Sequence, residues 1–199
     1  MPEVKTESTI RKAIIMAGGF GTRLRPLTIN IPKPLVPMMQ KPMMHHIANL
    51  LKAHGVKEIT ALLYFQPDAI RNYFGDGRKF GLKMNYIQAD ADYGTAGSVR
   101  NAYEFIDDRF IVISGDVLTD FDLSKALEFH IKRNAKATMI LTRVKNPLAF
   151  GVVITEKDGR VSRFLEKPSW GEVFSDTINT GIYLSLIHIS EPTRLLSIS

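Results

Sequence analysis

"KAIIMAGGFGTRLRPLT", residues 12–28, places a short apolar run directly before three glycines, an arginine and a proline. An apolar run of this length that stops at glycines is typical of a buried parallel strand. Glycines let backbone N–H groups approach phosphate oxygens, because no Cβ atom stands in the way. Taken alone, the glycines are better explained by a tight turn. The whole arrangement after a strand indicates an anion-binding loop.

Apolar runs alternate with segments of helical periodicity along the rest of the chain. We expect strands at residues 56–65, 82–89, 109–116 and 136–144, helices at 41–55, 67–77, 95–106 and 123–134, and a hairpin at 150–167 around Asp158-Gly159. Strands that alternate with helices indicate βαβ units. The predicted fold class is therefore α/β, a Rossmann-like three-layer α/β/α arrangement with a mostly parallel sheet. Ligands of such sheets bind at the carboxyl ends of the strands.

Composition excludes several classes of protein. The 199 residues are 45% hydrophobic and 23% charged, which suits a globular protein, and the absence of cysteine excludes disulfides and thiolate metal sites. No apolar run reaches the roughly 18–20 residues that span a bilayer, and the polar N-terminus lacks the apolar core of a signal peptide. We therefore expect a cytoplasmic protein with no membrane partner.

Charge points to small anionic substrates. The net charge is +6, and the basic residues are dispersed along the chain. No run of basic and aromatic residues offers a platform for stacking bases, so we expect no nucleic-acid partner.

Three well-known glycine loops do not match the opening segment. A dinucleotide loop opens a helix directly, but the prolines after Arg23 leave no room for a long helix. A Walker loop requires Gly-Lys followed by Ser or Thr, and a kinase loop lies in a hairpin. What remains is a glycine loop followed by Arg23 and by Lys33 in "PKP". Both side chains suit phosphate, and the prolines stiffen the segment that holds Lys33.

These motifs resemble the signature of the sugar-1-phosphate nucleotidyltransferases. The resemblance runs from "MAGGFGTRLRPLT" and "PKPLVPM" through "GTAGS" (94–98), "VISGDVLTDFDL" (112–123), "FGVV" (150–153) and "FLEKPSWGEVFSDTINTGIY" (164–183). It covers about residues 12–183, and the last motif most resembles the mannose-1-phosphate guanylyltransferase-like subgroup. The resemblance implies that a nucleoside triphosphate and a sugar 1-phosphate react to give a nucleotide sugar and pyrophosphate, with Mg²⁺ as cofactor.

The substrates and the assembly state remain open at this point. GTP with mannose 1-phosphate is the first expectation, and UTP, ATP or dTTP with glucose 1-phosphate is the alternative. A non-catalytic relative that binds nucleotide sugar is a further alternative, and homo-oligomer formation is left open. The subgroup usually has proline before the glycine of "GTAGS", where this chain has Tyr93, so the base is not fixed.

The resemblance also assigns roles to individual residues. Arg23, Lys33 and Asp116 are the implied catalytic residues, and Asp116 is the implied metal ligand. The implied nucleotide-binding residues are Ala17, Gly18, Gly19, Gly21, Thr22, Gly94 and Thr95. The implied sugar-phosphate-binding residues are Gly151, Glu166, Lys167, Asn179 and Thr180.

Several of these residues have simpler explanations when they are considered alone. Asp116 follows a strand, where a turn aspartate is as good an explanation as a Mg²⁺ ligand. Glu166 and Lys167 suit a surface ion pair, and Thr95 suits a helix cap. Asp122 is expected to cap the helix that starts at Leu123. His45 and His46 are neighbours on a helix and point about 100° apart, which argues against a shared metal.

The ends of the chain depart from this pattern. We expect a loose polar leader at residues 1–11, a nucleotidyltransferase domain at 12–184 and a non-native tail at 185–199. From Ser185 the tail departs from the family pattern and resembles translated sequencing-adapter read-through. On this expectation the domain is incomplete at its C-terminus and lacks the second carboxylate of the family's metal site.

Overall fold

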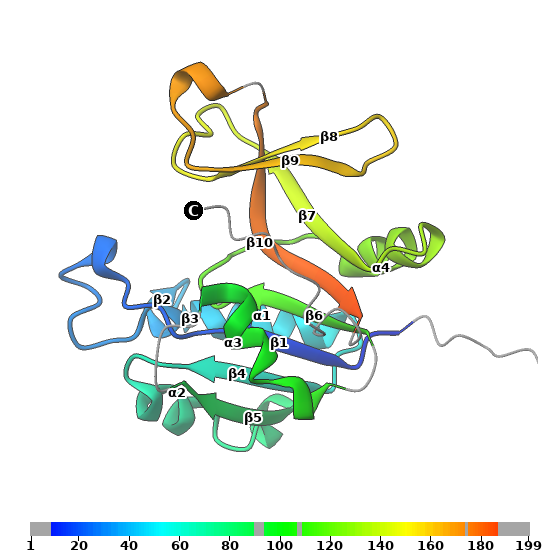
Figure 1. Ribbon diagram of the computed structural model, residues 1–199. Coiled ribbons are helices and arrows are strands. Elements are labelled where there is room, and N and C mark those ends of the chain that lie inside the picture. The colour runs from blue at the N-terminus through cyan, green and yellow to red at the C-terminus, as the bar shows by residue number, and fades with distance from the viewer. Residues whose placement is uncertain (1–8, 90–93, 107–108, 174, 187–199) are drawn as a thin grey trace, which may run out of the picture. The chain divides into compact units, whose positions relative to one another are not determined.

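The computed structural model describes residues 9–89, 94–106, 109–173 and 175–186 (Figure 1). The chain forms two compact units. One comprises the described residues up to Thr138 and from Tyr183 onward, and the other is Met139–Ile182. The predicted leader and tail lie largely outside the described residues, so the expected domain bounds remain predictions. Among the described residues, no helix is both long enough and apolar enough to cross a membrane.

The first unit is built on a parallel sheet. Its strand order is β5-β4-β1-β6, and beyond β6 the sheet continues into β10, whose residues from Tyr183 onward belong to this unit. The bounds are β1 Lys12–Met16, β4 Glu58–Leu63, β5 Lys83–Gln88, β6 Arg109–Ser114 and β10 Thr177–Leu186. Parallel pairing joins β1 to both β4 and β6, and joins β4 to β5. The predicted α/β arrangement with a mostly parallel sheet is confirmed.

The central strands are apolar because both of their faces are buried. Ile14 lies in register with Thr60 of β4 and Val112 of β6, whereas the next residue, Ile15, lies in register with Ala61 and Ile113. Successive side chains of a strand point to opposite faces of the sheet. Ile14 is 1% exposed and Ile15 is fully buried, so this one strand contributes to the core on both sides.

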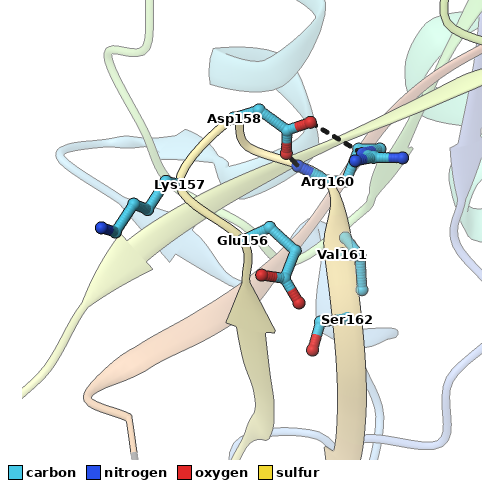
Figure 2. Close-up of a pocket in the computed structure, with 6 residues that line it drawn as sticks. All are labelled: Glu156, Lys157, Asp158, Arg160, Val161 and Ser162. Atoms are coloured by element: carbon cyan, nitrogen blue, oxygen red, sulfur yellow. Dashed lines mark hydrogen bonds and ion pairs between the residues drawn. The ribbon is translucent and has the colours of Figure 1, made fainter.

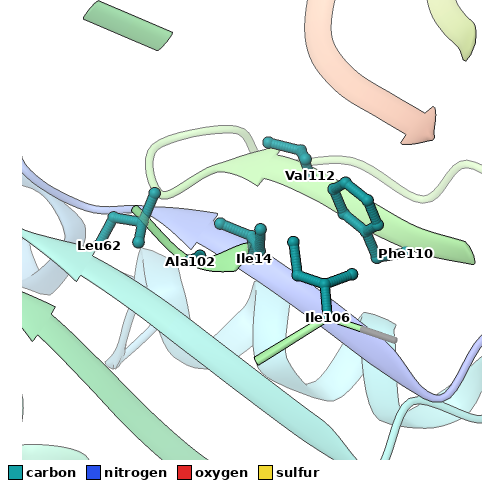
Figure 3. Packing of buried hydrophobic residues seen from close by; sticks show 6 residues of the cluster. All are labelled: Ile14, Leu62, Ala102, Ile106, Phe110 and Val112. Carbon is teal, nitrogen blue, oxygen red and sulfur yellow. The ribbon is translucent and has the colours of Figure 1, made fainter. Parts of the chain in front are cut away.

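One side of the core is a compact cluster (Figure 3). Ile14, Leu62 and Val112 point from three neighbouring strands toward Ala102 and Ile106, which follow α3 (Gly94–Arg100) along the chain. The other face of the sheet is covered by α1 (Met43–Ala53), which lies behind the strands in Figure 1.

Within its described residues, the first unit contains two further α-helices and four short 3₁₀ turns. The two α-helices are α2 (Pro67–Phe74) and α4 (Leu123–Lys132), and the short 3₁₀ turns are η1 (Thr22–Leu24), η2 (Lys33–Leu35), η3 (Arg78–Phe80) and η4 (Tyr103–Phe105). The side chain of Asp122 accepts hydrogen bonds from the backbone N–H groups of Ser124 and Lys125, so it caps α4 as predicted. A two-stranded hairpin, β2 (Pro37–Met38) with β3 (Lys41–Pro42), leads into α1.

The second unit is mostly antiparallel. It contains β7 (Ala137–Arg143) from Met139 onward, the β8–β9 hairpin (Gly151–Thr155 with Val161–Glu166), the short turn η5 (Trp170–Glu172) and the first part of β10. Ile178 of β10 pairs with Val152 of β8, and β7 pairs with β10. Gly159 at the tip of the hairpin has φ 88°, a conformation that favours glycine.

Several predicted elements are longer than the observed ones. The helix expected at 41–55 starts at Met43, because Lys41 and Pro42 belong to β3. The helix expected at 95–106 ends at Arg100, and after a turn the chain forms η4, whose last N–H bonds reach back only three residues. This break lets Ala102 and Ile106 both face the core. The Asp158-Gly159 pair predicts a two-residue turn, but five residues, 156–160, join the observed strands. Inside this loop the backbone N–H of Glu156 donates to the carbonyl oxygen of Arg160.

Replacing Ile15 by alanine should lower the free energy of unfolding by about 2–5 kcal/mol, because it leaves a cavity in the middle of the sheet. The matched control is Ile29→Ala, the same substitution at a side chain that is 55% exposed, which should change stability by less than about 0.5 kcal/mol. Urea denaturation of both variants measures the difference. Equal losses would contradict the assignment of β1 as the buried central strand.

Candidate functional site

The glycine loop begins where β1 ends. The backbone N–H of Ala17 donates to the carbonyl oxygen of Leu62 at 2.9 Å, so the chain keeps to the sheet for one residue beyond the strand. A Cβ atom on Gly18 would lie 3.0 Å from the Cβ of Tyr64. Glycine is thus needed at position 18 for the loop to lie close to the residues that follow β4.

Gly21 is required for a different reason. Its φ is 61°, a left-handed conformation, and a Cβ atom there would lie 3.0 Å from Thr28 Cγ2 and 3.1 Å from Lys33 Cβ. Thr28 is buried and its hydroxyl donates to the carbonyl oxygen of Gly21 at 2.7 Å. Sequence reasoning did not single out Thr28, although it closes the quoted "RPLT" motif. The contact fixes the far end of the loop beside the segment that carries Lys33.

Gly19 lies between these two constrained positions and is itself unconstrained. A Cβ atom there would have nothing within 4 Å. Its neighbour Phe20 lies with its ring centroid 5.4 Å from those of both Tyr64 and Phe65. The aromatic contacts attach the loop to the carboxyl end of β4, while the backbone at Gly19 stays open to a ligand.

Pro34, the next residue after Lys33, packs against Gly115 at the end of β6. Pro34 is buried, and a Cβ atom on Gly115 would lie 3.3 Å from Pro34 Cγ and 2.9 Å from the carbonyl oxygen of Met16. The backbone N–H of Gly115 donates to that carbonyl oxygen at 2.8 Å. Only a glycine lets Pro34 and the end of β1 pack so closely over this point. Lys33 is thereby brought next to Asp116.

Asp116 is held by two side chains. Lys33 Nζ donates to its Oδ2, and the Ser114 hydroxyl donates to its Oδ1 at 2.5 Å. The Lys33 and Asp116 side chains are 31% and 28% exposed. Burial by itself raises the pKa of Asp116, but the hydrogen bonds from Lys33 and Ser114 outweigh it and bring the pKa below its ordinary value of 3.8. Asp116 is therefore a carboxylate at neutral pH. Sequence reasoning missed Ser114.

The other predicted nucleotide-side residues belong to two separate segments of the chain. Thr22 and Arg23 are exposed in η1, which starts directly after Gly21. Gly94 begins α3, and the surroundings of the Thr95 side chain lie outside the described part of the structure, as does Tyr93. The structure thus brings the glycine loop, Lys33 and Asp116 together at one edge of the first unit.

The predicted sugar-phosphate residues all belong to the second unit. Gly151 lies opposite Glu166 in the β8–β9 hairpin, and a Cβ atom on Gly151 would lie 2.6 Å from Phe164 Cζ and 3.2 Å from Glu166 Oε2. Glu166 and Lys167 are exposed and their charged atoms are 3.4 Å apart. This is the surface ion pair that sequence reasoning gives as the simpler explanation, and such pairs contribute little to stability.

Asn179 and Thr180 lie within β10, whereas considered alone they suit a turn. Asn179 Oδ1 accepts from the backbone N–H of Gly181 at 2.9 Å, and Thr180 Oγ1 donates to the carbonyl oxygen of Ile140 at 2.6 Å. Gly181 has φ 76°, so the strand is locally irregular at this point. The local turn geometry therefore occurs inside a strand.

A shallow depression lies at the tip of the β8–β9 hairpin (Figure 2). It is lined by Glu156, Lys157, Asp158, Arg160, Val161 and Ser162. Asp158 accepts from the backbone N–H of Arg160 at 3.1 Å and from its Nε at 2.7 Å, which closes the loop on itself. None of the predicted site residues lines this depression.

Asp116 and Ser114 offer hard oxygen donors to a divalent cation. Among the residues that the structure describes, no three His, Cys, Asp or Glu side chains gather into a possible metal site. Mg²⁺ is commonly bound through one or two carboxylates together with substrate phosphates and water. The donor set therefore fits a magnesium ion that is bound jointly with a phosphate ligand.

The two neighbouring histidines of α1 have other partners. His45 Nδ1 lies 2.8 Å from the Tyr73 hydroxyl, and its ring contacts Phe80 edge-on. Burial, together with nearby positive charge, lowers the pKa of His45. His46 Nε2 lies 2.8 Å from the carbonyl oxygen of Met38. Each ring thus fixes a different segment onto α1.

Comparison with known proteins agrees with this arrangement. The model of the nucleotidyl transferase family matches residues 12–186, so the chain belongs to that family. It is 40% identical over 187 residues to a UTP–glucose-1-phosphate uridylyltransferase of Synechocystis, and 40% identical over 179 residues to mannose-1-phosphate guanylyltransferase 1 of Arabidopsis thaliana. Each alignment covers 87% of this chain but 48% and 49% of the relative, so the chain spans about half their length.

Solved structures agree as well. A Bacillus anthracis protein described as a glucose-1-phosphate thymidylyltransferase, in complex with sucrose, superposes with a TM-score of 0.83 at 30% identity. The match covers 90% of this chain and 73% of that one. Relatives named for different bases and sugars thus share this fold.

Gly21→Ala should destabilise the protein by about 1–2 kcal/mol, because alanine pays a steric cost in the left-handed conformation and its Cβ meets Thr28. Gly19→Ala is the matched control and should leave the free energy of unfolding within about 0.5 kcal/mol of the wild type. Thermal and urea unfolding compare the pair. A destabilised Gly19→Ala beside an unchanged Gly21→Ala would contradict the described loop.

Acid should remove the contribution of Asp116 to stability. Because its pKa is lower in the folded chain than in the unfolded one, its ionised form stabilises the fold above the ordinary value of 3.8, and this stabilisation is lost as the pH falls through the folded pKa. The stability difference between wild type and Asp116→Asn should therefore shrink below about pH 4. Asp120→Asn, an exposed neighbour, should show no comparable trend in urea titrations across pH.

Proposed function

We propose that the protein transfers a nucleotidyl group from a nucleoside triphosphate to a sugar 1-phosphate. An oxygen of the sugar phosphate forms a bond to the α-phosphorus, the bond from that phosphorus to the β-phosphate oxygen breaks, and pyrophosphate leaves. The single observation that carries the proposal is the meeting of the glycine loop, Lys33 and Asp116 at the carboxyl ends of β1 and β6 in a chain of this family.

The residues of the first unit suit this reaction. The attacking phosphate is already an anion, so the reaction requires positioning and neutralisation of charge more than a general base. The open backbone at Gly19 orients the triphosphate, and Arg23 stabilises charge on the transferring and leaving phosphates. Lys33 contacts the attacking phosphate and the α-phosphate. Bound through Asp116, Mg²⁺ supplies further neutralisation of phosphate charge.

In this proposal, residues of the second unit bind the sugar 1-phosphate. Glu166 accepts hydrogen bonds from sugar hydroxyls and Lys167 binds the sugar phosphate. Gly151, Asn179 and Thr180 complete the proposed sugar-phosphate subsite, as Gly94 and Thr95 complete the nucleotide subsite. The exposure of Glu166 and Lys167 supports this assignment, since both charged groups are accessible to a ligand.

GTP and mannose 1-phosphate are the proposed substrates, and the "FLEKPSWGEVFSDTINTGIY" motif together with the Arabidopsis relative supports this choice. Glucose 1-phosphate with UTP, ATP or dTTP is the second candidate, which the name of the Synechocystis relative favours. A purely regulatory relative is disfavoured because Arg23, Lys33 and Asp116 are all present. We propose that the reaction takes place in the cytoplasm.

A panel of four nucleoside triphosphates against mannose and glucose 1-phosphates, scored by pyrophosphate release, tests the proposal. It is run on the 199-residue chain and on a chimera in which residues from Ser185 onward come from the Arabidopsis relative. Metal-dependent release with GTP and mannose 1-phosphate is the expected result. Tight binding of a nucleotide sugar without release in either protein would favour the regulatory alternative.

Arg23→Ala should lower kcat by roughly 10²–10³ while the protein stays folded, because one lost donor to transition-state charge is worth about 3–4 kcal/mol. Arg25→Ala is the matched control, since Arg25 is also exposed and lies two residues along the chain. Steady-state pyrophosphate release by the more active of the two proteins measures both variants. Equal rates for Arg23→Ala and wild type would remove Arg23 from the site.

A further inference from the structure

We propose that Lys33 closes the carboxylate of Asp116 to a divalent cation until a triphosphate draws the lysine away. The inference rests on the proposed function, because it takes the triphosphate as the ligand and Asp116 as the metal-binding carboxylate. It concerns the order in which the site is filled. In the structure, both oxygens of this carboxylate have donors.

Competition between the lysine and a metal follows from charge. Lys33 Nζ contacts Oδ2, and Ser114 occupies Oδ1. A cation that approaches Oδ2 meets the lysine ammonium at contact distance, and like charges this close repel strongly in a partly buried site. The two side chains are 31% and 28% exposed, so water screens this repulsion only in part. A metal ion alone therefore binds weakly.

The fixed backbone of Lys33 makes an exchange of partners possible. Pro34 packs against Gly115, and the Cβ of Lys33 lies beside Gly21 at the end of the glycine loop. The lysine stem thus starts between the loop that takes phosphate and the carboxylate that takes metal. Four methylene groups let its ammonium turn from one to the other without movement of the backbone. Phosphate oxygens then accept the hydrogen bonds that Asp116 gives up.

The result is positive coupling between metal and triphosphate. Because coupling free energies are reciprocal, a ligand that removes the lysine from Asp116 tightens the metal, and the metal tightens that ligand equally. Lys33 therefore has two opposite effects. It weakens binding of a metal to the free protein, and its release from Asp116 makes metal binding depend on the triphosphate.

Binding of Mn²⁺ alone, without nucleotide, tests the inference. Electron paramagnetic resonance of free Mn²⁺ is recorded at neutral pH with wild type, Lys33→Met, Lys33→Gln and the control Lys57→Met. Lys57 is an exposed lysine before β4, at the opposite ends of the strands from Asp116. Both Lys33 variants should bind Mn²⁺ about 5-fold tighter or more, the lower end of typical coupling factors, whereas Lys57→Met should match the wild type.

The double variants Lys33→Met/Asp116→Asn and Lys33→Gln/Asp116→Asn locate the effect. The gain in Mn²⁺ affinity should vanish in both. No gain in either folded Lys33 variant, a gain that survives the loss of the Asp116 charge, or an equal gain in Lys57→Met would each overturn the inference. Circular dichroism identifies the folded variants, and two substitutions at position 33 guard against the failure of one.

A second measurement addresses release of the lysine. Saturating GTP should increase Mn²⁺ retention by the wild type beyond what GTP alone binds in solution, and the increase should fall in Lys33→Met. An equal increase in both would show that the lysine stays on Asp116, which overturns the exchange. The proposed function fails separately, through the absence of pyrophosphate release with every substrate pair. The Mn²⁺ titrations require no turnover.

Discussion

The position of β1 between β4 and β6, with both faces buried, is the constraint on which the rest of the first unit depends. Its residues pair in register with a parallel strand on either side, so the carboxyl ends of three strands are fixed relative to one another. The segments that follow these three strand ends therefore start from fixed positions in the sheet. The glycine loop, the Tyr64-Phe65 pair and Asp116 are the three segments that do so. The geometry of the site is thus inherited from the sheet.

Glycines in the loops after these strands then let the site residues lie close together. Gly18, Gly21 and Gly115 are each placed where a Cβ atom would meet a neighbouring segment, so three loops lie closer together than side chains would permit. In each case the close contact is with a neighbouring part of the protein. Gly19 alone of the four opens onto empty space. Gly18, Gly21 and Gly115 therefore allow the loops to pack tightly, whereas Gly19 leaves the backbone accessible to a ligand.

The sequence predicted the sheet well because burial leaves a direct pattern in it. Continuous apolar runs marked β1, β4 and β6, whereas the helix expected at 41–55 is shorter, because Lys41 and Pro42 pair in β3. The break after Arg100 was not predictable, since "NAYEF" continues the helical pattern and only tertiary packing of Ala102 and Ile106 ends it. Helix propensity depends on the local sequence, whereas the core packing that overrides it joins residues far apart in the chain.

The contacts within the candidate site could not be predicted from the sequence. Lys33 and Asp116 were both identified from their motifs, yet nothing in either motif says that they touch, because the contact depends on Pro34 resting on Gly115. Ser114 and Thr28 were missed because a hydroxyl near a strand end has no distinctive spacing. Asn179 and Thr180, which suit a turn when considered alone, lie inside β10.

The separation of Lys33 from Asp116 along the chain, 83 residues, has a consequence for biosynthesis. A ribosome that adds about 5–20 residues per second delivers the carboxylate roughly 4–17 s after the lysine. Once β4 has been made, β1 has one neighbouring strand but still lacks β6, and the apolar side chains that β6 will cover face water. Arrival of β6 simultaneously completes the hydrophobic seam and delivers the anionic partner of Lys33.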